Sequence, residues 1–115
     1  MSHYDVLRLV RRYPFGGEVV MTDLQSQSQL TGRTKEISLF GCGIDAFKDF
    51  PPGREVKIEL LYQGAKMLAL GKVVYARPGL GIGIRFTSVE MEDERILDGW
   101  ITELAKHSLV GGQRE

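Results

Sequence analysis

Short stretches in which apolar and polar residues alternate dominate the chain as far as Thr87. The clearest covers residues 54–61, where Val56, Ile58 and Leu60 alternate with charged residues. Because successive side chains of a β-strand point to opposite faces, this pattern predicts a strand with one buried face. Alternation or β-rich composition of the same kind predicts four more strands, over 18–23, 30–40, 66–76 and 81–87.

Turn signals separate these predicted strands. Pro51-Pro52-Gly53 precedes the clearest strand, 62–65 is typical of a hairpin loop, and Arg77-Pro78-Gly79 turns the chain again. Gly71 lies inside a long predicted strand and indicates a bulge. Several short strands joined by turns favour a closed or nearly closed antiparallel barrel.

The period of the apolar residues changes after the last predicted strand. Thr87 and Glu90 have the spacing of a capping box, which predicts a helix start. The apolar residues that follow recur at helical spacing and predict a helix from about Val89 to Lys106; they are Ile96, Trp100, Ile101 and Leu104.

The predicted fold class is therefore all-β, an antiparallel β-barrel with a C-terminal α-helix. The 115 residues, 43% hydrophobic and 26% charged, are the size and composition of one globular domain. We expect a single domain over 1–115, with a flexible N-terminal arm over 1–14, a β-barrel over 15–87 and the helix over 88–108. Without a signal-peptide pattern or an apolar run of about 20 residues, we expect a cytoplasmic protein that does not enter a membrane.

The charge balance and the reactive residues exclude several function classes. Fifteen Lys and Arg residues match 15 Asp and Glu residues, whereas proteins that bind DNA or RNA through phosphates carry a basic excess. We therefore expect no nucleic-acid partner. One cysteine, Cys42, and two distant histidines, His3 and His107, predict no metal site and no cofactor. Cys42 is expected to be a small buried residue. No catalytic arrangement appears, so we expect no enzymatic activity.

Two stretches carry candidate binding chemistry. The first, 8–15, contains Arg8, Arg11 and Arg12; the second, 36–41, contains Glu36, Ser38 and Gly41. Arginine offers a planar fork that binds phosphate or the O6/N7 edge of guanine with two hydrogen bonds. Taken separately, the first stretch is also typical of a solvated basic patch and the second of a turn.

Together with the rest of the chain, these stretches resemble the PilZ domain family. That family has Arg-x-x-x-Arg before its first strand and Asp/Asn-x-Ser-x-x-Gly about two dozen residues later. The resemblance runs from Arg8 to Phe86 and continues through three further segments, Pro52-Gly53 with the alternating strand to Ile58, Gly71-Lys72-Val73-Val74, and Gly81-Ile82-Gly83-Ile84-Arg85-Phe86.

The resemblance implies a six-stranded antiparallel PilZ-type barrel that binds the bacterial second messenger cyclic di-GMP. In such domains the arginines bind phosphate and the guanine edge, the Asp/Asn and Ser hydrogen-bond guanine, and the Gly permits the turn. Carried onto this chain, the resemblance implies a ligand site with six residues, which are Arg8, Arg11, Arg12, Glu36, Ser38 and Gly41.

The sequence departs from the family pattern at two of these positions. When Arg11-Arg12-Tyr13-Pro14 is aligned on the family, Phe15 stands where the second arginine belongs, and we expect its ring to stack on a base instead. Pairing Arg8 with Arg12 restores the spacing of the two arginines. Glu36 replaces Asp or Asn, which keeps a carboxylate but adds one methylene.

Two functions remain open on this basis. The first is a cyclic di-GMP receptor in which the N-terminal segment orders over the ligand and switches a signalling partner. The resemblance suggests an output in motility, secretion or exopolysaccharide production. The alternative is a degenerate PilZ domain that does not bind cyclic di-GMP and works as a protein–protein adaptor, as in pilus or motility machinery. An oligonucleotide-binding barrel is disfavoured by the zero net charge.

Overall fold

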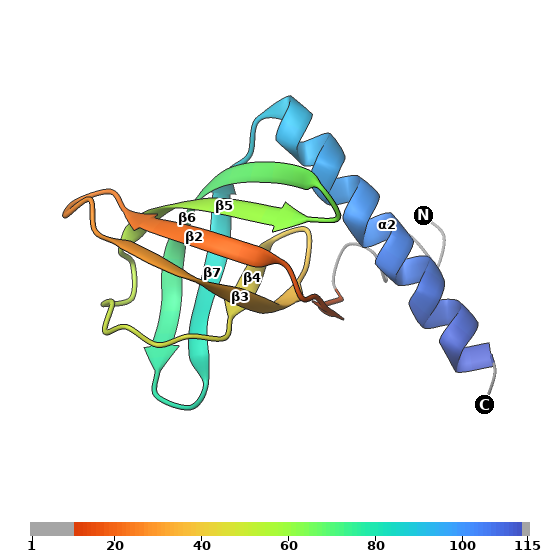
Figure 1. Ribbon diagram of the computed structural model, residues 1–115, viewed down its shortest axis with the longest axis horizontal. Coiled ribbons are helices and arrows are strands. Elements are labelled where there is room, and N and C mark those ends of the chain that lie inside the picture. Colours follow the sequence, from red (N-terminus) through yellow and green to blue (C-terminus); the bar gives the residue numbers. More distant parts are fainter. Residues whose placement is uncertain (1–10, 114–115) are drawn as a thin grey trace.

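The strands pair into one antiparallel sheet that closes on itself (Figure 1). This computed structural model describes residues 11–113, with side chains described through His107. The sheet order is β1-β3-β2-β5-β6-β7-β4, and β3 also pairs with β4, so six strands form a closed barrel and β1 is an addition. The elements are β1 (Tyr13–Pro14), β2 (Glu18–Asp23), β3 (Gln29–Ile37), β4 (Gly41–Ile44), β5 (Glu55–Tyr62), β6 (Ala65–Arg77), β7 (Gly81–Ser88) and α2 (Met91–Gln113). The predicted all-β barrel with a C-terminal helix is confirmed.

Strand β5 shows why these residues form a barrel. Its side chains Val56, Ile58 and Leu60 are fully buried, while Lys57 lies on the outer face. Burying one such aliphatic side chain contributes roughly 1.5–3 kcal/mol. Strand β2 pairs with β5, and its buried side chains join the same core. The apolar positions of the predicted alternation therefore form the interior of the barrel.

The connections follow the predicted turns. Gln63 and Gly64 both have positive φ, 50° and 79°, in the two-residue turn between β5 and β6. Positive φ at both central positions is the geometry that suits the twist of a tight hairpin, and glycine adopts it without strain. The register of β6 against β7 shifts between Leu70 and Gly71, which confirms the predicted bulge.

Cys42 lies on β4 with its side chain buried. Burial raises the pKa of the Cys42 thiol to about 12, since the charged thiolate would lose its hydration. The thiol therefore stays protonated at neutral pH, and the expectation of a small buried residue is confirmed.

The helix begins and ends later than the sequence predicted. Thr87 belongs to β7, which continues to Ser88 because Ser88 pairs with Leu70 on β6. The carbonyl of Glu90 accepts from the N–H of Glu94 (2.8 Å), so the predicted capping box of Thr87 and Glu90 is wrong. No proline interrupts the helix, which runs to Gln113, beyond the predicted Lys106. Within residues 11–113, no helix is long and apolar enough to cross a bilayer.

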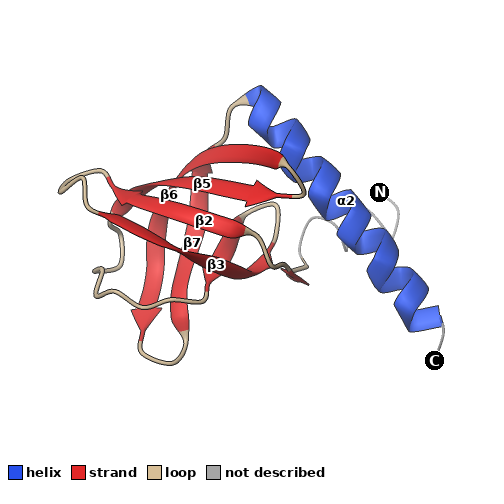
Figure 2. Cartoon of the chain, in the orientation of Figure 1, coloured by secondary structure: helices blue, strands red, loops and turns tan. Residues whose placement is uncertain are grey.

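One face of α2 packs on the barrel beside the β5–β6 hairpin, as Figure 2 shows. The buried residues recur at helical spacing and include two of the four predicted ones; they are Leu97, Trp100, Ile101 and Ala105. Ile96 and Leu104 are partly buried against the same core. The predicted amphipathic helix is confirmed.

The predicted N-terminal arm, 1–14, is only partly described. Its residues 1–10, with the predicted flexibility and Arg8, lie outside the described residues. Tyr13 and Pro14 form β1 and pair with Ile37 and Glu36 of β3. This short pairing brings the arginine-rich stretch beside the second candidate stretch.

Candidate ligand-binding site

Arg12 and Glu36 come together across the pairing of β1 and β3. Nη1 of Arg12 lies 2.7 Å from Oε1 of Glu36, and the two side chains are 59% and 31% exposed. The hydrogen bond to Glu36 is the main cause that raises the pKa of Arg12, and the nearby Tyr75 adds to it. Ion pairs this exposed stabilise a fold by only about 0–1 kcal/mol. The pair is therefore easily exchanged for another partner.

Ser38 and Gly41 shape the turn that joins β3 to β4. The Ser38 N–H donates to the Gly41 carbonyl (2.9 Å), and the Phe40 N–H donates to Oγ of Ser38 (3.1 Å). The turn that the sequence predicted for the stretch 36–41 is thus present. A side chain at Gly41 would collide with the carbonyl of Ile84, and its Cβ would lie 3.2 Å from Cα of Arg85. Glycine lets the turn approach β7 this closely.

A hollow of about 260 Å³ opens beside this turn. The N-terminal flank and the turn supply part of its wall, and β4, β6 and β7 supply the rest. Its lining residues are Arg12, Ser38, Phe40, Gly41, Val74, Tyr75, Gly83, Ile84 and Arg85. It combines two guanidinium groups, two hydroxyls and two aromatic rings, which is the chemistry of a site for an anionic, aromatic ligand.

Strand register explains the far wall of the hollow. Gly41 pairs with Arg85, and Tyr75 on β6 pairs with Gly83 on β7. The Tyr75 ring lies over Gly83, where a side chain would overlap it. Arg77 and Arg85 are candidate contributors on the later strands that the sequence alone does not place, and Tyr75 was not predicted, because alternation within a strand does not specify which residues meet across strands. Of the two arginines, Arg85 lines the hollow.

Of the six predicted site residues, the structure brings four together. Arg12, Ser38 and Gly41 line the hollow, and Glu36 adjoins it through Arg12. The guanidinium of Arg11 instead lies 5.5 Å from the centre of the Tyr13 ring, a cation–π distance. Arg8 is outside the described residues.

Phe15 is not at the hollow. Its ring is 3% exposed and packs 4.3 Å from the Tyr62 ring and 5.3 Å from the Trp100 ring, between centroids. The expectation that Phe15 stacks on a base is therefore wrong. Tyr13 and Phe15 point inward while Arg12 and Pro14 point outward, as alternation along an extended segment requires.

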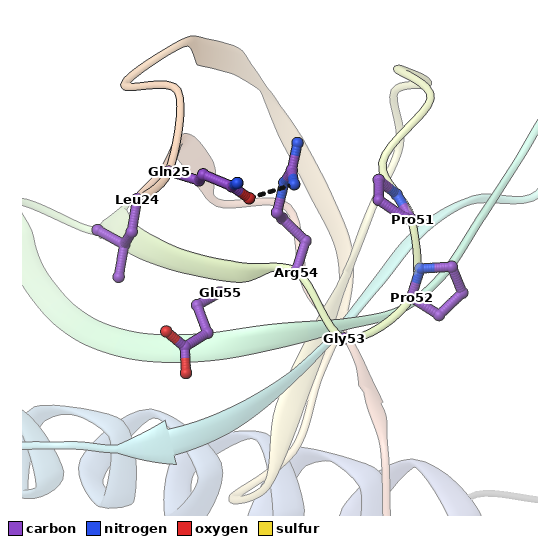
Figure 3. Close-up of a pocket in the computed structure, with 7 residues that line it drawn as sticks. All are labelled: Leu24, Gln25, Pro51, Pro52, Gly53, Arg54 and Glu55. Carbon is purple, nitrogen blue, oxygen red and sulfur yellow. Dashed lines mark hydrogen bonds between the residues drawn. The ribbon is translucent and has the colours of Figure 1, made fainter.

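A second hollow, of about 480 Å³, lies between the β2–β3 turn and the loop before β5 (Figure 3). Its one cation, Arg54, donates to the carboxylate of Asp23 (3.0 Å) and to the Gln25 side chain. Burial alone would raise the pKa of Asp23, but hydrogen bonds from Gln25 and Ser26 and the charge of Arg54 hold it below its usual value. These polar groups bind one another, and their contacts link the β2–β3 turn to the loop before β5.

Comparisons with known proteins agree with this geometry. The protein-family model described as PilZ domain matches residues 8–103. Three solved structures share the fold. The PilZ domain of CeSA from a cellulose-synthesizing bacterium is 21% identical (TM-score 0.64), with 78% of this chain and 97% of that chain covered. The PilZ domain of Escherichia coli YcgR, solved with c-di-GMP, is 18% identical (TM-score 0.62), with 90% and 95% covered.

The third is the Bacillus subtilis inhibitor of motility MotI/DgrA. It is 11% identical (TM-score 0.66), with 80% of this chain and 48% of that chain covered. No curated protein sequence matches the chain. At these identities the structural likeness supports the fold, and the chemistry has to be argued from the residues of the hollow.

Proposed function

The chain belongs to the PilZ domain family, and from this premise we propose that it is a cyclic di-GMP receptor whose site is the hollow beside the 38–41 turn. One observation carries the proposal. Arg12, Ser38 and Gly41, which match the two family motifs, line the same hollow although up to 29 positions separate them. The family consists of binding domains, and the role proposed is recognition without a reaction.

The lining groups suit the parts of a cyclic dinucleotide. The Arg12 guanidinium is a bidentate donor for a phosphodiester. Phe40 and Tyr75 offer aromatic surface on which a guanine base stacks, a contact worth about 1–3 kcal/mol per base. Ser38 and Glu36 hydrogen-bond the polar guanine edge. Arg11 lies beside the Tyr13 ring and does not line the hollow, so the proposal gives the phosphate contact to Arg12.

The Arg12–Glu36 ion pair makes the site responsive to ligand. Breaking an exposed pair costs about 0–1 kcal/mol. A hydrogen bond to a charged group contributes roughly 1.5–3 kcal/mol. A ligand phosphate, whose oxygens can accept from the guanidinium at two points, competes with Glu36 for Arg12, and the released carboxylate accepts from the guanine N–H groups. Because this exchange occurs beside β1, it is the proposed switch that a signalling partner detects.

Isothermal titration calorimetry tests the receptor function. The wild-type chain is titrated with cyclic di-GMP beside Arg12→Ala and the control Arg77→Ala, whose side chain is exposed and outside the hollow. We expect saturable micromolar binding by the wild type and the control. Losing one charged hydrogen bond weakens Arg12→Ala about 10- to 150-fold. Flat heats for all three proteins at high micromolar ligand would contradict the receptor function.

A second candidate function, a protein adaptor, has its own observation. A groove of about 500 Å³ between the 38–41 turn and the start of α2 is lined by apolar side chains, of which Phe40 is 58% and Met91 67% exposed. Exposed apolar surface of this kind marks sites of protein interaction. Glu94 and Asp98 outnumber Arg95 along its edge, which favours a partner segment with apolar anchors flanked by basic residues.

Phe40 lines both the groove and the ligand hollow, so the two functions are compatible. The adaptor function is tested by affinity capture from a bacterial lysate with the wild type, Met91→Asp and the control Leu80→Asp, a residue exposed elsewhere. We expect one saturable partner that the wild type and the control retain and Met91→Asp loses. Equal capture by all three would assign the contact to another surface.

A further inference from the structure

Arg85 is a second guanidinium at the hollow that the two family motifs do not contain. It lies on β7, is exposed, and lines the hollow with Arg12. Within residues 11–113 no hydrogen bond or ion pair engages its side chain, whereas Arg12 and Arg54 are bound to carboxylates. A guanidinium at a hollow that has no partner among the described residues is available to a ligand.

A neighbouring cation strengthens the case for an anionic ligand. Arg85 on β7 lies directly opposite Lys72 on β6. Directly opposed residues of antiparallel strands share a face of the sheet, and like charges in that arrangement are destabilising. Glu55 on β5 lies directly opposite Lys72 on its other side and offsets part of that charge, whereas Arg85 has no carboxylate partner among the described residues. A bound phosphate would supply the anion that Arg85 lacks.

The backbone holds Arg85 in a fixed position. On the other side of β7, Arg85 is paired with Gly41, which carries no side chain to fill the space beside the arginine. The N–H of Phe86 donates to the carbonyl of Phe40 (2.7 Å), which ties β7 to the turn one residue further on. Arg85 is thus anchored to the same turn that presents Ser38, and little ordering of the backbone is needed for binding.

We propose that Arg85 is a phosphate-binding arginine of this site, a second guanidinium that acts beside Arg12. Phe15 does not contribute to it, because its ring packs in an aromatic cluster with Tyr62 and Trp100. The inference rests on the proposed cyclic di-GMP function. A cyclic dinucleotide carries two phosphodiesters. Arg12 approaches from the segment before β1 and Arg85 from β7, so two arginines from separate segments serve one ligand with two anionic groups.

The test is a calorimetric titration with cyclic di-GMP of the wild type, Arg85→Gln, Arg85→Lys and the control Arg77→Gln. We expect Arg85→Gln to bind about 10- to 150-fold more weakly, the loss of one charged hydrogen bond. Arg85→Lys recovers part of this loss, because it keeps the charge without the planar fork. Arg77→Gln binds like the wild type. Matching thermal denaturation midpoints establish that all four are folded.

The outcomes separate this inference from the function on which it rests. If the wild type binds and Arg85→Gln binds equally well, the inference is overturned and the receptor function stands. If Arg85→Lys and Arg85→Gln bind cyclic di-GMP equally weakly, the positive charge of residue 85 does not matter, and its contact with a phosphate is overturned. If the folded wild type does not bind, the receptor function fails first, and the role of Arg85 fails with it.

Discussion

Arg12 and Phe15 lie on either side of β1, three positions apart, in two opposite environments. Arg12 is 59% exposed in an ion pair at the edge of the hollow, whereas Phe15 is 3% exposed against Tyr62 and Trp100. An odd separation along an extended segment places two side chains on opposite faces. The inner face of this segment fastens the helix to the barrel, and the outer face is available to a ligand.

The comparison explains the departure from the family motif at Phe15. In the register that begins at Arg11, the second motif position is Phe15. It lies two residues from Tyr13 along the extended segment, and both side chains point inward. In the register that begins at Arg8, the second arginine is Arg12, which points outward. The outward position of Arg12 suits the binding role proposed for it, and the buried position of Phe15 gives that ring a role in stability.

The largest effect is expected from Phe15→Ala. Removing a buried aromatic ring costs about 3–5 kcal/mol through lost burial and the cavity that remains. Urea denaturation followed by the fluorescence of Trp100, whose ring lies against Phe15, measures the change. The conservative control Phe15→Leu is expected to lose less stability than Phe15→Ala. A loss below about 1 kcal/mol for Phe15→Ala would show that the aromatic cluster does not stabilise the fold.

Gly41→Ala should have the next largest effect. The new Cβ would meet the Ile84 carbonyl, and such overpacking typically costs about 1–3 kcal/mol. Because β7 has to move, we also expect weaker ligand binding through displacement of Arg85. Gly99→Ala is the matched control, since its Cβ meets nothing within 4 Å and helix propensity favours alanine by about 1 kcal/mol. An unchanged stability of Gly41→Ala would contradict the close approach of the turn to β7.

Acidification is expected to remove the contribution of Asp23 to stability. The folded-state pKa of Asp23 lies below its unfolded value, so its contribution is fully present above about pH 4 and is lost as the pH falls through the folded-state pKa. Denaturation midpoints from pH 6 to pH 2 should fall less steeply for Asp23→Asn than for the wild type. Parallel curves for the two proteins would remove Asp23 as a pH-dependent contact.

The smallest effect on stability is expected from Arg12→Ala. An exposed ion pair contributes about 0–1 kcal/mol, so the urea midpoint should stay close to that of the wild type even where ligand binding falls. A loss comparable to that of Phe15→Ala would place Arg12 in the scaffold and contradict the contrast between the two faces of the segment.

The alternation of residues and the turn signals predicted the architecture because they act locally. Val56, Ile58 and Leu60 alternate in the sequence and are buried in the barrel, and the bulge at Gly71 is present. The helix start was missed because Thr87 is held in β7 by pairing with another strand. That pairing is a long-range interaction, which the local capping pattern does not contain.

The site was predictable where the family motifs carry it: the resemblance named Arg12 together with Ser38, and local spacing indicated the turn. Ser38 and Gly41 lie in one turn, and their spacing indicated it. Arg85 and Tyr75 join them through strand register across tens of residues, which a single sequence does not specify. The inward position of Phe15, by contrast, follows from alternation with Tyr13 and was available in the sequence.

A nuclear magnetic resonance titration of the labelled chain with cyclic di-GMP tests the central claim, that the hollow binds ligand while the aromatic cluster is scaffold. We expect concentration-dependent shifts of the backbone amides of 38–41 and 83–85. The indole N–H of Trp100, the one tryptophan of the chain, should stay in place. Shifts confined to Trp100 and Phe15, or to the 51–55 loop, would contradict the assignment of the site to the hollow.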